Sequence, residues 1–168
     1  TELKYAVLSF SSGCKWITSE PMIVEDNNSW KDLSANGITD LGMAFEELTS
    51  MLSRKKFLKS PSLSYAPVIF LMTDGYPTDN YKKGLEKLKN NNWYKYGMKI
   101  ALGIGDYFDE SVLEEFTENK ELVVKAANSS QLAKLIKTIA VTSSQIASKS
   151  MTIVSDEENE LDYEDVEG

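Results

Sequence analysis

Two short segments carry oxygen-bearing side chains at positions where a folded sheet could present them to a ligand. Residues 36–42 read Asn-Gly-Ile-Thr-Asp-Leu-Gly, and they place Thr39 directly before an expected helix. Residues 70–75 read Phe-Leu-Met-Thr-Asp-Gly, an apolar strand that is followed at once by Asp74. A hydroxyl and a carboxylate are oxygen ligands of the kind that hard cations such as Mg²⁺ prefer. Thr39 and Asp74 are therefore candidate metal ligands, while a helix cap at Thr39 and a turn residue at Asp74 remain the alternatives.

The residues available for catalysis are few. The chain has no histidine, and Cys14 is its only cysteine. This composition excludes Ser-His-Asp and Cys-His nucleophilic sites, His-ligated zinc and an internal disulfide. A haloacid-dehalogenase-like phosphatase would carry its nucleophilic Asp where Met72 stands. Residues 103–108 have Phe108 where a dinucleotide-binding loop needs its third glycine, so they are interpreted as a strand-to-helix turn. We predict a protein that is not an enzyme, with a Rossmann-like hydrolase as the less favoured reading.

The net charge of −8 comes from the end of the chain. Residues 156–168 contain eight acidic side chains and no basic one, which leaves 18 acidic against 18 basic residues elsewhere. We expect one domain over residues 1–150 and an acidic, disordered tail over 151–168, with a docking tail for a basic partner as the alternative. The sequence shows no stripe of basic residues, so it does not predict a nucleic-acid ligand. No apolar run approaches the roughly 20 residues of a membrane span, and the single cysteine favours a cytoplasmic protein.

The first half of the chain predicts two strands and a helix. Residues 3–10 form a short apolar strand, and residues 16–24 form its antiparallel neighbour after a brief connection. Residues 40–57 form an amphipathic helix. Its apolar residues recur at helical spacing: Leu41, Ala44, Phe45, Leu48, Met51 and Leu52.

The second half continues the alternation of strands and helices. The expected elements are a strand over 67–73 covered on both faces, a helix capped by Thr78 or Asp79, a strand over 98–104, a helix capped by Asp109, an edge strand over 121–124 and a last helix through Leu132, Leu135, Ile136 and Ile139. This order predicts an α/β fold of the doubly wound, Rossmann-like kind, with a mostly parallel sheet and helices on both faces.

Ligands of such sheets bind at the carboxyl ends of the strands. Thr39 and Asp74 both fall at that edge of the predicted sheet. Asp106, Asp109 and Glu110 lie at the same edge, where they are interpreted as a turn and a helix cap, with a contribution to the ligand surface as the alternative.

Several segments resemble von Willebrand factor A (VWA) domains. Residues 36–44 resemble the family motif Gly-Gly-Thr-x-Leu-Gly-x-Ala, with Asn-Gly in place of the double glycine. Residues 70–79 are similar to the Leu-Thr-Asp-Gly-x-Pro-Thr-Asp string of the TerY-like, tellurite-resistance-associated group of bacterial proteins. Residues 5–12, 101–105 and 143–148 continue the likeness, which covers about residues 3–150.

The chain departs from the family at one motif. The Asp-x-Ser-x-Ser loop that begins the metal-ion-dependent adhesion site (MIDAS) of VWA domains is absent. Ser9 and Ser11 have the Ser-x-Ser spacing, but Val7 stands where an Asp is needed. We therefore expect a VWA-like domain that lacks its first strand and helix, with a gap in the sheet between the strands over 3–10 and 67–73.

The resemblance implies a cytoplasmic protein-interaction module in bacterial stress or tellurite-resistance-like signalling. It also implies a partial MIDAS in which Thr39 and Asp74 contact Mg²⁺ and a partner protein offers a carboxylate to the ion. The alternative is a metal-free structural remnant, or a fragment that another segment or chain completes.

Three aromatic residues, Trp93, Tyr94 and Tyr96, precede the strand over 98–104. Such residues usually pack a connection onto the sheet, and an exposed contact patch is the alternative.

Overall fold

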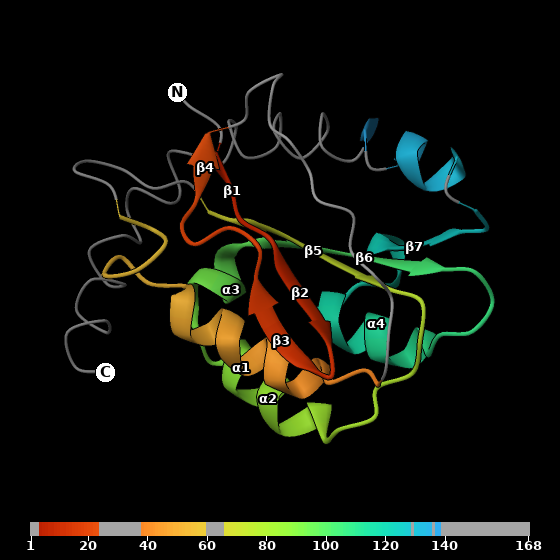
Figure 1. Ribbon diagram of the computed structural model, residues 1–168, viewed down its shortest axis with the longest axis horizontal. Helices are drawn as coiled ribbons and strands as arrows, with labels where there is room; N and C mark the ends of the chain where they lie inside the picture. The colour runs from red at the N-terminus through yellow and green to blue at the C-terminus, as the bar shows by residue number, and fades with distance from the viewer. Residues whose placement is uncertain (1–3, 24–37, 60–65, 129, 136, 139–168) are drawn as a thin grey trace. The chain divides into compact units, whose positions relative to one another are not determined.

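The computed structural model describes residues 4–23, 38–59, 66–128, 130–135 and 137–138 (Figure 1). These residues divide into two compact units. The first runs up to Met51 and includes Pro77–Leu88, and the second comprises Leu52–Tyr76 and the chain from Lys89 onward. The acidic tail predicted over 151–168 lies outside the described residues.

The first unit contains two short antiparallel strand pairs. Strand β1 (Lys4–Tyr5) pairs with β4 (Met22–Ile23), and β2 (Leu8–Ser11) pairs with β3 (Gly13–Trp16). The predicted antiparallel pairing is confirmed, but the bounds of both strands are wrong. The strand over 3–10 is not continuous, and of the described residues in the strand over 16–24 only Trp16 and Met22–Ile23 lie in strands. The first of these strands is interrupted between Tyr5 and Leu8, where the Val7 amide donates to the Thr18 hydroxyl rather than to a strand backbone.

Helix α1 (Leu41–Met51) packs against β2 and β3 in this unit (Figure 1). Its buried face carries Leu41, Ala44 and Phe45, as the helical spacing predicted. The helix ends earlier than the predicted residue 57. A turn replaces it, in which the Ser53 carbonyl accepts hydrogen bonds from the amides of Lys56 and Leu58.

Helix α2 (Tyr81–Lys89) lies against α1 at two glycines. A Cβ atom on Gly84 would stand 2.3 Å from the Gly42 carbonyl oxygen, and one on Gly42 would stand 2.9 Å from the Asn80 carbonyl oxygen. No side chain fits between these backbones, so the close approach of the two helices requires glycine at both positions.

The second unit contains a parallel sheet of three strands in the order β5-β6-β7. The strands are β5 (Val68–Thr73), β6 (Met98–Ile104) and β7 (Val123–Ala126). Leu71 lies opposite Ala101, and Leu102 lies opposite Val124. The predicted strand over 98–104 is confirmed, whereas the strand predicted over 121–124 is shifted, because residues Lys120–Leu122 form a 3₁₀ turn.

Helices α3 (Asn92–Tyr96) and α4 (Glu110–Thr117) complete the described core of this unit. Helix α4 contacts β6 and β7, and it buries Val112, Leu113 and Phe116, as predicted. Residues 130–135 and 137–138 are helical, in agreement with the predicted last helix, of which Ile136 and Ile139 lie outside the described residues. The α/β fold with a parallel sheet and flanking helices is confirmed.

Strand β5 departs from the prediction of a strand covered on both faces. Phe70 and Met72 are 36% and 44% exposed, although Leu71 between them is buried. Within the described residues β5 has a neighbouring strand on one side only. Alternate side chains of a strand point to opposite faces, so Phe70 and Met72 mark one face of β5 that is less covered than the face of Leu71.

No helix in the described part of the chain combines the length and hydropathy of a membrane span.

Candidate functional site

Thr39 is held by its backbone in the first unit. Its amide donates to the Thr78 hydroxyl over 2.9 Å, and its carbonyl accepts from the Thr78 amide over 2.9 Å. Two reciprocal hydrogen bonds leave the Thr39 backbone little freedom, although it stands at the end of a connection rather than inside a helix. The Thr39 side chain is half-buried.

The Asp79 carboxylate caps the start of α1. One of its oxygens accepts from the Gly42 amide over 3.0 Å and the other from the Met43 amide over 3.1 Å. Amides in the first turn of a helix have no partner within the helix, and the positive end of the helix dipole favours a negative charge there. The prediction that Thr78 or Asp79 caps the helix that follows them is therefore wrong, because both side chains bond to the start of the helix before them.

Asp40 connects the same helix start to the β2–β3 turn. Its carboxylate accepts from the Gly13 amide over 2.6 Å, and its amide donates to the Ser11 carbonyl over 2.8 Å. Gly13 has φ of +79°, a left-handed conformation that glycine adopts without strain. The sequence predicted Asp40 only as the first residue of a helix. Gly13, in the turn after β2, was the one residue whose type could have indicated the contact with Asp40.

Asp74 follows directly on β5 in the second unit, where its side chain is exposed. The Thr73 hydroxyl oxygen lies 3.3 Å from the amide nitrogen of Gly75 and 3.3 Å from its carbonyl oxygen. These contacts stabilise the turn that carries Asp74. Two residues further on, the Tyr76 ring lies against the Tyr107 ring, with centroids 4.8 Å apart.

The connection after β6 is a tight strand-to-helix turn, as predicted. The Gly105 amide donates to the Ala126 carbonyl over 2.8 Å, and Gly105 has φ of +76°. The Phe108 ring packs on Gly103, where a Cβ atom would stand 2.3 Å from the ring. These contacts show that the glycines serve the packing of the turn.

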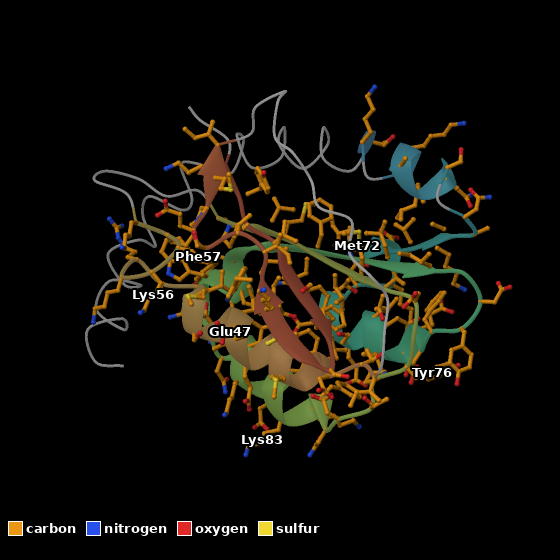
Figure 2. The ribbon with its side chains drawn as sticks, in the orientation of Figure 1. Glu47, Lys56, Phe57, Met72, Tyr76 and Lys83 are labelled. Atoms are coloured by element: carbon orange, nitrogen blue, oxygen red, sulfur yellow. The ribbon has the colours of Figure 1, made fainter. Side chains whose placement is uncertain are left out.

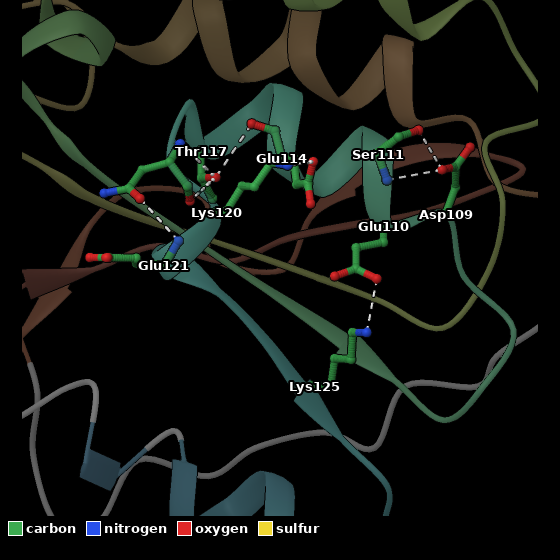
Figure 3. Close-up of polar contacts among 9 residues, drawn as sticks. Asp109, Glu110, Ser111, Glu114, Thr117, Lys120, Glu121 and Lys125 are labelled. Atoms are coloured by element: carbon green, nitrogen blue, oxygen red, sulfur yellow. Dashed lines mark hydrogen bonds and ion pairs between the residues drawn. The ribbon is translucent and has the colours of Figure 1, made fainter.

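Figure 3 shows two acidic residues of this turn, Asp109 and Glu110, in structural roles. Asp109 caps α4, since its carboxylate accepts from the Ser111 amide over 3.1 Å and from the Ser111 hydroxyl over 2.6 Å. Glu110 forms an ion pair of 2.8 Å with Lys125 of β7. The predicted helix cap at Asp109 is confirmed.

The aromatic residues of α3 pack the core of the second unit. Trp93 and Tyr94 are buried, and the Tyr94 hydroxyl donates to the Phe116 carbonyl. Burial, and to a lesser degree the charge of Glu118, raise the pKa of Tyr94 far above its ordinary value. The predicted packing role holds for Trp93 and Tyr94, and a contact patch that includes them is wrong; Tyr96 alone is exposed.

Thr39 and Asp74 belong to different units, and the structure describes the surroundings of each one separately. No cluster of three or more Asp, Glu, His or Cys side chains suited to a metal ion occurs among the described residues. One hydroxyl and one carboxylate match the oxygen chemistry of a hard divalent cation but not the full coordination shell that such an ion needs. Metal binding by Thr39 and Asp74 stays a prediction.

Comparisons with solved structures identify known proteins that share this fold. No family model and no curated protein sequence matches the chain. Proximal thread matrix protein 1 from the mussel byssus, solved with a zinc-occupied MIDAS motif, matches with a TM-score of 0.61 and 23% identity, over 81% of this chain and 35% of that one. A von Willebrand factor type A protein from Catenulispora acidiphila matches with a TM-score of 0.60 and 16% identity, over 89% of this chain and 34% of that one.

The ArnB paralog VWA2 from Sulfolobus acidocaldarius is a third such structure, with a TM-score of 0.56 and 16% identity over 77% of this chain and 32% of that one. The chain thus spans about a third of the length of the structures that it matches. At these identities the likeness concerns the fold alone, and the chain has the α/β fold of VWA domains.

Proposed function

We propose that the chain is a non-enzymatic protein-interaction module of VWA type, in which Thr39 and Asp74 contribute to a partial MIDAS. In this proposal a divalent cation, Mg²⁺ or a similar ion, joins these two oxygen ligands to a carboxylate of a partner protein. The cation would supply positive charge that a neutral or acidic surface lacks. The remaining oxygen ligands would come from outside these 168 residues, as the absent Asp-x-Ser-x-Ser loop suggests.

The observation that carries the proposal is the pair of hydrogen bonds by which Thr78 holds the Thr39 backbone. The Thr-Asp of the string Asp-Gly-Tyr-Pro-Thr-Asp bonds back to the start of α1, so the segment that begins with Asp74 ends by holding the backbone around Thr39. These hydrogen bonds join Thr78 and Asp79, at the end of that string, to the residues around Thr39 inside the first unit. The zinc-occupied MIDAS of the mussel protein supports the choice of a divalent cation.

The finer context is also part of the proposal. Asp-Gly-Tyr-Pro-Thr-Asp resembles the TerY-like group, and on that ground we assign the chain to the cytoplasm of a bacterium and to tellurite-resistance-like signalling. A VWA domain without its first strand and helix would also leave β5 at the edge of the sheet, as observed among the described residues.

Calorimetric titration with Mg²⁺, Mn²⁺ and Zn²⁺ tests the metal site. We expect Asp74→Asn and Thr39→Val each to weaken cation binding by about tenfold or more, because the first removes the negative charge of one ligand and the second removes the hydroxyl oxygen of the other. Glu86→Gln is the matched control, since Glu86 is an exposed carboxylate on α2 that the proposal does not use. Equal binding by Asp74→Asn and the control would overturn the site and favour the metal-free alternative. A hydrolase activity that Asp74→Ala abolishes would overturn the non-enzymatic assignment.

A further inference from the structure

Two exposed tyrosines lie together at the carboxyl ends of neighbouring strands in the second unit. Tyr76 follows β5 (Figure 2) and is 44% exposed, and Tyr107 follows β6 and is 73% exposed. Their ring centroids are 4.8 Å apart and their planes are inclined by 63°, an edge-to-face pair. The buried aromatic residues of this unit, Trp93, Tyr94 and Phe116, lie in its core. Tyr76 and Tyr107 contact each other at the surface instead.

The two connections that carry these rings are acidic. Residues 74–77 and 105–110 contain four carboxylates and neither Lys nor Arg. Asp109 is engaged with Ser111, and the charge of Glu110 is paired with Lys125. Asp74 and Asp106, the remaining two, are exposed and stand within two residues of the tyrosines along the chain.

We propose that Tyr76, Tyr107 and Asp106 form a docking surface for an arginine side chain of a partner protein. In an edge-to-face pair the ring that offers its edge keeps its own faces clear of the other ring, and a guanidinium group stacks on such faces. Arginine also pairs with a carboxylate through its planar fork of donors, so one side chain can use a ring and Asp106 together.

The charge at this edge decides between classes of partner. A nucleic acid or an acidic peptide would meet repulsion from Asp74 and Asp106, whereas a basic peptide would be attracted. Exposed tyrosines are also among the side chains that contribute most at protein interfaces. This surface lies wholly in the second unit and needs no metal ion. Asp74 contributes to its charge and also belongs to the proposed metal site, so the two proposals are tested separately by removing metal ions.

The test is a titration of the full chain, in excess EDTA, with a fluorescently labelled, amidated Gly-Ser-Arg-Gly-Arg-Ser-Gly peptide. Anisotropy should show saturable binding that weakens as salt rises. The same peptide with citrulline in place of arginine has the same shape without the charge, and it should bind at least about fivefold more weakly. Equal binding of the two peptides, or no saturable binding of the arginine peptide, would overturn the proposal.

Variants locate the binding on the chain. Tyr107→Leu should weaken arginine-peptide binding about fivefold, while Tyr107→Phe, which keeps the ring, should retain it. Asp106→Asn should weaken binding and reduce its dependence on salt. Tyr96→Leu is the control, because Tyr96 is an exposed tyrosine of α3 in the same unit. A Tyr107→Leu variant that binds like the wild type and like Tyr96→Leu would refute the docking surface. Because EDTA is present throughout, a negative result here leaves the proposed metal site unaffected.

Discussion

Replacing Asp79 with alanine removes the one carboxylate that accepts hydrogen bonds from the Gly42 and Met43 amides at the start of α1. Loss of a capping side chain costs about 0.5–2 kcal/mol, and loss of a negative charge at a helix N-terminus costs about 0.3–1 kcal/mol more. We therefore expect Asp79→Ala to lower the free energy of unfolding of the first unit by about 2 kcal/mol. Asp79→Asn keeps one acceptor without the charge and should lose about half as much.

Amide hydrogen exchange measured by NMR reports this change at the residues concerned. A loss of about 2 kcal/mol corresponds to roughly 30-fold faster exchange of the Gly42 and Met43 amides through the opening of the helix start. Glu86→Gln is the control, because it removes one exposed negative charge from α2 and leaves the cap intact. Unchanged exchange at Gly42 and Met43 in Asp79→Ala, or an equal effect of Glu86→Gln, would refute the capping argument.

Three further predictions concern packing and ionisation. Gly84→Ala should destabilise the first unit by about 1–3 kcal/mol in urea unfolding, because its Cβ would overlap the facing helix, whereas the exposed control Lys83→Ala should change little. Burial raises the pKa of Tyr94, so wild-type stability should fall as the pH rises above about 10, where the unfolded tyrosine ionises first, and Tyr94→Phe should lack that fall. Burial raises the pKa of the Cys14 thiol, and the negative charges of Glu47 and Asp40 raise it further. Alkylation of Cys14 by iodoacetamide at about pH 8.5 should therefore be slow, and Glu47→Gln should accelerate it.

The elements that depend on local signals were predictable. The strand Met98–Ile104 has the apolar character of a buried parallel strand, interrupted only by Lys99, and its bounds match the prediction. Helix α4 combines an Asp cap with apolar residues at helical spacing, so both its start and its buried face follow from neighbouring residues. In each case the side chains that decide the element lie within one or two turns of each other.

The contacts of Asp79 were not predictable from local signals. An Asp just before a helix normally caps that helix, and nothing in the neighbouring residues distinguishes a carboxylate that turns to an earlier helix. The exposed face of β5 is a similar case, because an apolar run has the same sequence whether or not another layer packs on each of its faces. Both outcomes depend on which segments meet after folding.

The sequence alone determined the α/β class, the parallel strand over 98–104 and the cap at Asp109, but it missed helix α3. The candidate ligands Thr39 and Asp74 stay a prediction. Only the tertiary structure showed that Thr78 and Asp79 hold the start of α1, that Gly42 and Gly84 let two helices touch, and that Tyr76 meets Tyr107 at the surface. The physical reason is the range of the interactions. Periodicity and capping act between neighbours in the chain, whereas these contacts join residues about 30 to 40 positions apart, whose meeting depends on how the intervening chain folds.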